Sequence, residues 1–307
     1  MNTQDLRNQT IGVEIEGTGL TRRKAAETAA EFFGTEVHYV GGGYDTYEVK
    51  DTQGRAWKFQ RDASIHCYKK VNGIFTAAGS EYSVEAVSPI LTYEDIPTLQ
   101  ELVRKLRKSG MVSGPKYCTG VHIHIGLGKH TPKSLCNLIN LMASKEDLIY
   151  EALEVDSRRM QYCKKMNETL INEIKRQRPN TFSKLADVWY TAHGTNYNRH
   201  GHYNESRYHC LNLHAAFTKH TVEFRLFNFD GKLHAGKLRA WIVMCLAMSN
   251  QALNQTSASS RKSTNTNKKF VMRTWLCRMG LSGDEFANCR EHLTAKLTGN
   301  SAWSHRA

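Results

Sequence analysis

Five short stretches of the chain alternate apolar residues with ionisable or polar ones. Successive side chains of a β-strand point to opposite faces, so this period of two predicts strands with one apolar face and one polar face. In the first stretch Val13 and Ile15 share one face, and Glu14 and Glu16 share the other. The five stretches are residues 12–16, 58–64, 81–85, 121–125 and 222–226. A sheet built from them can bury its apolar face against helices, and it presents a strongly charged second face.

Helical spacing of apolar residues separates these strands. We predict helices over residues 21–33, 95–108, 132–153, 157–177, 233–250 and 284–297. Gly34 follows the first helix as a C-cap, and Pro132 lies in the first turn of the third. The strands are expected to extend over residues 11–16, 36–49 (a hairpin that turns at residues 41–43), 56–65, 81–91, 120–126, 208–213 and 221–229. This mixture indicates an α+β fold, with helices packed on one face of a sheet.

The charged face of the predicted sheet carries more acids than bases. Its ionisable residues are Lys58, Asp62, Glu14, Glu16, Glu81, Glu85, His122, His124, Glu223 and Arg225. A single strand of this kind is most simply explained by charges that lie in water. If several acids converge, however, each carboxylate pair about 4 Å apart repels by roughly 4 kcal/mol, against a typical domain stability of about 5–15 kcal/mol. Cations must then offset the repulsion, and carboxylates with imidazoles suit Mg²⁺ or Mn²⁺.

Arg225 shares a predicted strand face with Glu223. A guanidinium beside acidic metal ligands suits phosphoryl transfer, in which positioning and charge neutralisation do most of the work. The phosphate-binding motif GxxxxGK[ST] is missing, because Ile123 stands where its first Gly would precede Gly128 and Lys129. If ATP binds, metals and basic side chains must therefore hold it.

Six motifs occur in an order that resembles the amidoligase group of the glutamine synthetase and glutamate–cysteine ligase superfamily. The motifs are residues 12–16, 62–65, 85–89, 119–124, 207–212 and 221–227. The resemblance implies a glutamine-synthetase-like fold, in which an antiparallel β-sheet cups the active site and helices pack on the other face. It also implies an ATP-dependent ligase that joins a carboxylate to an amine through an acyl phosphate, with ATP and Mg²⁺ (or Mn²⁺) as cofactors.

The resemblance further implies roles for individual residues. The implied metal ligands are Glu14, Glu16, Glu85, His124 and Glu223. The implied contacts to nucleotide or acid are His122, Arg207, Asn212 and Arg225. Arg225 would also hold the transferred phosphoryl group, while Asp62 and Ser64 would face the substrates. The family usually has Gly between that Asp and Ser, and the Ala63 of this chain places a methyl group there.

Charge and segment composition suggest partners and boundaries. The formal net charge of the 307 residues is +13, which is most simply explained by an anionic cofactor site beside a solvated basic face. The charge also permits a nucleic acid or an acidic protein as a macromolecular substrate. We predict a catalytic domain over residues 1–255, a mobile segment rich in Ser, Thr, Asn and Lys over 256–269, and a helical extension over 270–307.

The longest apolar run, residues 240–248, is too short to span a bilayer, and residues 1–10 lack a signal-peptide pattern. We therefore expect a cytoplasmic protein without a membrane partner.

Other functions remain open at this point. The same site could serve a kinase, and the basic charge could serve a non-enzymatic nucleic-acid-binding protein. A zinc site is disfavoured, because the spacing of His193, His200, His202 and His209 matches no usual ligand pattern. The eight cysteines are scattered singly without a CxxC motif. A nucleophilic role is disfavoured for Cys67, Cys118, Cys163 and Cys210, because no adjacent base can be read for them.

Overall fold

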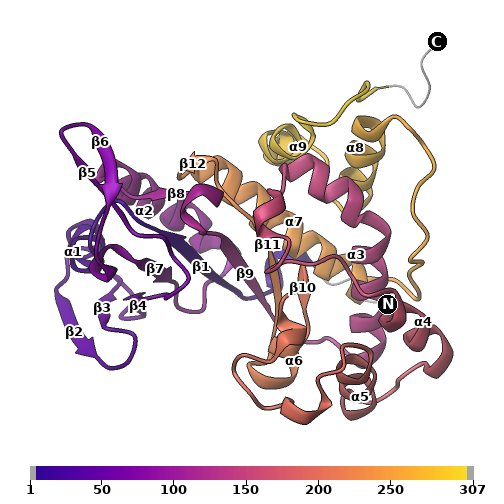
Figure 1. Ribbon diagram of the computed structural model, residues 1–307. Helices are drawn as coiled ribbons and strands as arrows, with labels where there is room; N and C mark the ends of the chain where they lie inside the picture. Colours follow the sequence, from indigo (N-terminus) through magenta and orange to yellow (C-terminus); the bar gives the residue numbers. More distant parts are fainter. Residues whose placement is uncertain (1–4, 303–307) are drawn as a thin grey trace. The chain divides into compact units, whose positions relative to one another are not determined.

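The computed structural model describes residues 5–302, which fold into two compact units (Figure 1). The first, named here the sheet unit, consists of residues 10–123 and 227–239. The second, named the helical unit, has the remaining described residues. The described range forms nine α-helices and twelve strands, a mixed α/β fold with a large antiparallel sheet. None of those helices combines the length and the apolarity needed to cross a lipid bilayer.

The sheet unit is built on an antiparallel sheet. Along β1 (Ile11–Gly17), apolar and acidic side chains alternate between its two faces as predicted. The strand order of the sheet is β9, β1, β7, β4, β3, β2, where β9 contributes its first three residues. The bounds are β1 (Ile11–Gly17), β2 (Val37–Gly41), β3 (Thr46–Lys50), β4 (Ala56–Gln60), β7 (Val84–Val87) and β9 (Val121–Gly126). The unit also holds the hairpin of β5 (Tyr68–Val71) and β6 (Ile74–Ala77), and the pair of β8 (Val112–Ser113) and β12 (Gly231–Lys232).

One face of this sheet is covered by α1 (Arg22–Phe33), beside which α2 (Ile96–Lys108) packs. The side chain of Thr21 caps α1 by accepting from the Lys24 N–H at 3.1 Å, and Gly34 ends the helix with a left-handed φ of 70°, as predicted. The Phe33 ring lies 5.7 Å from that of Trp57 on β4, centroid to centroid. Because side chains alternate along a strand, α1 covers the apolar face and leaves the acidic residues of β1 and β7 on the other.

The helical unit holds two antiparallel strands, β10 (Leu211–Asn212) and β11 (Thr221–Phe227), and most of the helices. The helix α3 has the predicted bounds, since Thr131 and Ser134 form a capping box and Pro132 occupies the first turn. The apolar run at residues 240–248 lies in α7 and is buried throughout, so it forms core. The helices are α3 (Pro132–Leu153), α4 (Glu168–Gln177), α5 (Phe182–Ala192), α6 (His214–Thr218), α7 (Ala235–Asn254), α8 (Lys268–Arg278) and α9 (Ala287–Thr294).

Two predicted strands of the sheet unit are shorter than expected, and this corrects the placement of three residues. The strand predicted over 56–65 ends at Gln60, because the Asp62 carboxylate accepts from the Ser64 N–H at 2.7 Å in a local turn that competes with strand pairing. The strand predicted over 81–91 covers only β7, and Glu81 lies in a preceding 3-10 helix (Ser80–Tyr82). Asp62, Ser64 and Glu81 are therefore not on the strand faces assigned to them.

Predictions for the helical unit also need correction. The helix predicted over 157–177 is replaced by a 3-10 turn (Ser157–Arg159), an irregular stretch and α4, which Asn167 caps. The strand predicted over 208–213 has only the two residues of β10, followed by α6. The helix α5 and the β5–β6 hairpin were not predicted. The predicted segment 256–269 has neither helix nor strand before α8 begins at Lys268. Residues 1–4 and 303–307, the ends of the predicted catalytic domain and extension, lie outside the described residues.

Candidate active site

A row of polar side chains crosses the sheet unit on the sheet face opposite α1. Glu16 on β1 stands opposite Glu85 on β7, which in turn stands opposite Gln60 on β4. Glu16 and Glu85 are only 5% and 9% exposed, and the Gln60 amide donates to Glu85 Oε2 at 2.7 Å. Burial, and then the charges of Glu14 and Glu16, raise the pKa of Glu85 well above its usual range. This face thus brings several carboxylates close together, and their mutual repulsion contributes to the raised pKa of Glu85.

An imidazole lies between the two acids of β1. His122 Nδ1 is 3.0 Å from Glu14 Oε2, and His122 Nε2 is 3.6 Å from Glu16 Oε1. The Gly120 N–H also donates to Glu16 Oε2 at 2.6 Å. These contacts orient both carboxylates. The sequence predicts that this ring contacts the nucleotide, and the structure places a carboxylate beside each of its nitrogens.

Three carboxylates of the sheet unit are close enough to share one cation. Oxygen atoms of Glu16, Asp62 and Glu85 lie within 4.8 Å of one another. Asp62 reaches them from the turn after β4, where its carboxylate accepts from the Ser64 hydroxyl at 2.6 Å and its N–H donates to Ser83 Oγ at 3.0 Å. Oxygen donors at this separation, with a net negative charge, fit the requirements of Mg²⁺ or Mn²⁺. Ser64 itself is exposed and serves here to orient Asp62.

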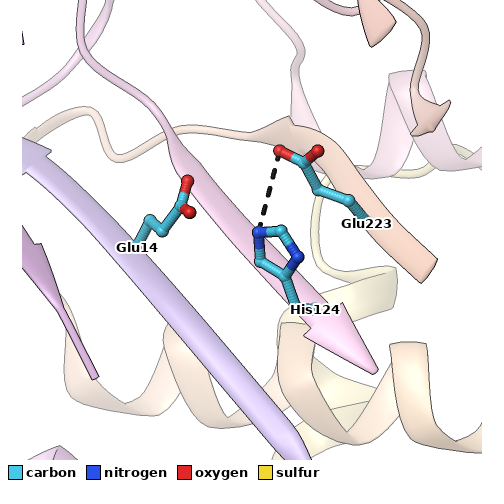
Figure 2. A group of neighbouring side chains, drawn as sticks. All are labelled: Glu14, His124 and Glu223. Atoms are coloured by element: carbon cyan, nitrogen blue, oxygen red, sulfur yellow. Dashed lines mark ion pairs between the residues drawn. The ribbon is translucent and has the colours of Figure 1, made fainter. Parts of the chain in front are cut away.

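The helical unit contains a buried ion pair on β11. Glu223 and Arg225 are 3% and 5% exposed, and Arg225 Nη1 donates to Glu223 Oε1. Asn212 stands opposite Glu223 on β10 and donates to its Oε2 at 2.5 Å. His124 Nε2 lies 3.9 Å from Glu223 Oε1, and Figure 2 shows this pair on its two strands. Glu14, drawn in the same figure, belongs to the sheet unit.

Tyr208 was not predicted as a site residue, although it lies within the 207–212 motif. Its ring centroid is 5.8 Å from Arg207 Cζ and 5.9 Å from Arg225 Cζ. Arg207 also donates to the His202 carbonyl at 2.8 Å, so the loop before β10 fixes its position. Guanidinium–ring contacts of this kind contribute roughly 0.5–2 kcal/mol each. Arg207 is thereby linked to Arg225 through an aromatic ring, a relationship that no linear motif encodes.

A thiol–imidazole pair lies elsewhere in the sheet unit and corrects the view that Cys118 has no partner base. Cys118 Sγ is 3.5 Å from His66 Nδ1, and Cys118 is half-buried. The contact is supported by the main chain, since the His66 N–H donates to the Tyr117 carbonyl at 2.9 Å. The two residues are 52 positions apart in the chain, so only the fold brings them together.

Comparisons with known proteins place the chain in a family. The model of a family described as "putative amidoligase enzyme" matches residues 7–249. No curated protein matches the chain. Among solved structures, a bifunctional glutathione synthetase from Pasteurella multocida is similar with a TM-score of 0.43 and 11% identity over 97% of this chain. The chain spans about half of that protein, 49% of its length, and the similarity is too low to support an argument about function. Because the family model covers most of the chain, the protein belongs to this amidoligase family.

Proposed function

We propose that the protein is an ATP- and Mg²⁺-dependent ligase (Mn²⁺ being the alternative metal) that joins a carboxylate to an amine through an acyl phosphate. Family membership supports amide-bond formation. The observation that carries the metal- and ATP-dependent part is the cluster of Glu16, Asp62 and Glu85, in which both Glu carboxylates are buried and Asp62 is half-buried. The pKa of Glu85 is raised by burial and by neighbouring acids. Such a cluster is costly unless a cation completes it.

The metal ligands are proposed on each unit separately. On the sheet unit they are Glu14, Glu16 and Glu85, to which the structure adds Asp62 as a candidate. On the helical unit they are His124 and Glu223. A divalent cation bound to such oxygen and nitrogen ligands neutralises phosphate charge and orients the phosphoryl group. His122 is proposed to contact the nucleotide, and its ring also orients Glu14 and Glu16.

Arg225 is proposed to stabilise the phosphoryl group as it transfers from ATP to the substrate carboxylate, with release of ADP. The amine nitrogen then attacks the acyl carbon, the C–O bond to phosphate breaks, and phosphate leaves as the amide forms. Glu223 holds Arg225 in place through their buried pair, and a fixed charge stabilises a transition state without reorganisation. Asn212 and Arg207 are proposed to line the nucleotide or acid pocket, Arg207 through its contact with Tyr208.

The fold is proposed to be glutamine-synthetase-like, because the charged face of the sheet lies opposite the helix-covered face. Residues 1–255 are proposed as the catalytic domain, in keeping with the family match over 7–249. The acid and the amine are proposed to be polar small molecules or modified side chains of a macromolecule, and the net charge of +13 favours an anionic substrate.

The decisive test is the fate of ATP. Purified protein with Mg²⁺ is incubated with panels of carboxylates and amines, including polyamines, amino acids and nucleic acids, and adducts are sought by mass spectrometry. We expect ADP and phosphate to appear only when both substrates are present, and hydroxylamine to trap the acyl phosphate as a hydroxamate. Release of AMP and pyrophosphate would reject the acyl-phosphate route. A stable phosphorylated product without an amide would identify a kinase instead.

A matched pair of variants tests the metal cluster in the same assay. Glu85→Gln removes one carboxylate from the buried row, whereas Glu81→Gln removes an exposed carboxylate from the 3-10 helix four residues earlier. We expect Glu85→Gln to raise the Mg²⁺ concentration needed for half-maximal turnover at least tenfold. Loss of a residue that merely supports a metal ligand already lowers metal affinity by about 10–100-fold. Glu81→Gln should leave it unchanged.

A further inference from the structure

A buried cation without an anionic partner lies in the helical unit. Arg159 ends the 3-10 turn that follows α3 and is 4% exposed. Its Nη2 donates one hydrogen bond of 3.1 Å to the backbone carbonyl of Arg225. Its Nε is buried without a hydrogen-bond partner, and within residues 5–302 no carboxylate lies within ion-pair distance of it.

The acids around this segment are bound by other groups. Asp156 is held by Arg158, whose Nη2 lies 2.7 Å from Asp156 Oδ2, and Arg159 affects that acid only as a more distant charge. Glu223 is held by Arg225 and by Asn212. Of the three buried charges on Arg159, Arg225 and Glu223, two are therefore positive and one is negative.

The main chain holds Arg159 beside β11. Its carbonyl accepts from the N–H groups of Tyr162 at 2.8 Å and Cys163 at 3.0 Å. Two hydrogen bonds join this segment to Arg225. Arg225 Nε donates to the Tyr162 carbonyl at 3.5 Å, and Arg159 Nη2 donates to the Arg225 carbonyl. A guanidinium fixed in this way and left without a counter-charge is costly to bury, and an anionic ligand would offset that cost.

We propose that Arg159 binds the transferred phosphoryl group together with Arg225. This inference rests on the proposed function and names a residue that it did not include. A phosphoryl group carries close to two negative charges at neutral pH, and the charge of Arg225 is already offset by Glu223. Arg159 supplies the missing positive charge, and its planar fork of N–H donors suits phosphate oxygens.

The test measures binding of inorganic phosphate to the full chain without ATP, metal or substrates. Phosphate affinity is determined by calorimetry at constant ionic strength, with chloride as the reference anion. We expect Arg159→Met to weaken phosphate binding at least tenfold, as the loss of a charge-assisted hydrogen bond predicts. Arg158→Met is the matched control, because this neighbour has a side chain 60% exposed and is paired with Asp156. It should bind phosphate as the wild type does.

A second neutral variant and a stability measurement distinguish binding from a structural role. Arg159→Gln can keep a hydrogen bond to the Arg225 carbonyl while losing the charge, and we expect it to weaken phosphate binding as Arg159→Met does. Without phosphate, both variants should melt at or above the wild-type temperature, because an unpaired buried charge has been removed. Unchanged phosphate affinity in either folded variant would overturn the inference, as would a lowered melting temperature with unchanged affinity.

The two proposals fail separately. Arg159-dependent phosphate binding in a protein that ligates no acid to any amine would reject the ligase proposal and keep the phosphate site. Conversely, amide synthesis with release of ADP and with wild-type turnover in Arg159→Gln would keep the ligase proposal and reject the role of Arg159.

Discussion

Glu16 and Glu85 face each other as cross-strand partners on β1 and β7. Directly opposed side chains have Cβ atoms about 4.5–5.5 Å apart, and like charges in such positions destabilise a sheet. Both residues are buried; Gln60 lies beside Glu85, and His122 Nε2 lies 3.6 Å from Glu16 Oε1. A cation bound by the two carboxylates, as proposed above, would offset their repulsion.

Replacing Glu85 should therefore stabilise the metal-free protein. We expect Glu85→Gln to raise the free energy of unfolding by roughly 1–2 kcal/mol in EDTA, because it removes a carboxylate from a buried acidic row. For a chain of this size that corresponds to a few degrees of melting temperature. The stabilisation that Mg²⁺ gives to the wild type should shrink in the variant. A variant less stable in EDTA, with an undiminished response to Mg²⁺, would contradict the cation site.

Acid sensitivity should arise from a buried histidine of the helical unit. His130 is 5% exposed and lies between the hydroxyls of Ser134 and Ser249, at 3.0 and 2.8 Å. Burial lowers its pKa from 6.5 to about 4. Between pH 4 and 6.5 the unfolded chain therefore binds a proton on His130 that the folded chain does not bind. The stability that neutral His130 gives to the folded state is fully present above pH 6.5 and declines as the pH falls toward 4.

The size of this effect can be measured in a pH series of unfolding experiments. A difference of about 2.5 pKa units corresponds to on the order of 3 kcal/mol lost between pH 6.5 and 4. His130→Gln, which cannot titrate, should show a flatter dependence over this window. An equal decline in the variant and the wild type would assign the acid sensitivity to other groups, for example His209, whose pKa burial also lowers to about 4.

The sequence predicts most of the elements that have strong local signals. The period-two stretch at β1, the Thr131–Pro132 start of α3 and the Gly34 end of α1 are set by contacts within a few residues, and they are found as predicted. Asn212 and Glu223, each within a predicted motif, are cross-strand partners, a pairing that the sequence alone does not predict.

Elements whose form depends on competing or distant contacts were not predictable in this way. The turn at Asp62 is favoured by a side-chain hydrogen bond that the strand pattern conceals. The contacts of Arg159 with Arg225 and of Cys118 with His66 join residues 66 and 52 positions apart. Single-sequence patterns carry no information about such distances, so these side chains were not recognised as partners.

The segment over residues 256–269 should be the preferred site of limited proteolysis. It has few apolar residues to offset the entropy of ordering. Lys262 nevertheless pairs with Glu146 at 3.1 Å and with Asp147 at 2.6 Å on α3. The exposed pair with Asp147 contributes about 0–1 kcal/mol, and the buried Glu146 carboxylate also loses its cation in the variant. Lys262→Ala should therefore accelerate cleavage by subtilisin roughly fivefold or more, and high salt should weaken the exposed pair in the wild type.

Arg261→Ala is the matched control for this cleavage experiment, because its exposed side chain makes no ion pair with a residue in 5–302. It should be cut at the wild-type rate. Cleavage concentrated at residues 193–207 instead would show that the loop before β10 is the more mobile part of the chain.

Cys118 should be the cysteine that iodoacetamide modifies first. It is half-buried with an imidazole 3.5 Å from its sulfur, and the imidazole can accept the thiol proton. Burial raises the pKa of Cys67, and that of Cys136 to about 11, which slows their modification. Peptide mapping after brief alkylation checks the order. His66→Ala should slow modification of Cys118 severalfold and leave Cys67 unaffected, and an unchanged rate at Cys118 would mean that His66 does not activate it.

The buried pair on β11 predicts that Arg225 acts on stability as well as on turnover. Arg225→Ala leaves Glu223 as a buried charge without its cation, which costs about 3–5 kcal/mol. Removing both charges in Arg225→Met with Glu223→Gln should restore most of that stability, because neutral groups of similar size avoid the penalty. Turnover should not recover, since the charge proposed to stabilise the phosphoryl group is gone, and losing one such contact lowers rates by about 10²–10³. Arg225→Lys should restore activity poorly, because an ammonium lacks the planar fork of N–H donors.

Chemical denaturation and steady-state kinetics on the same samples separate the effect on stability from the effect on turnover. A double variant that regains both stability and turnover would show that the pair is structural and that phosphoryl transfer does not depend on Arg225.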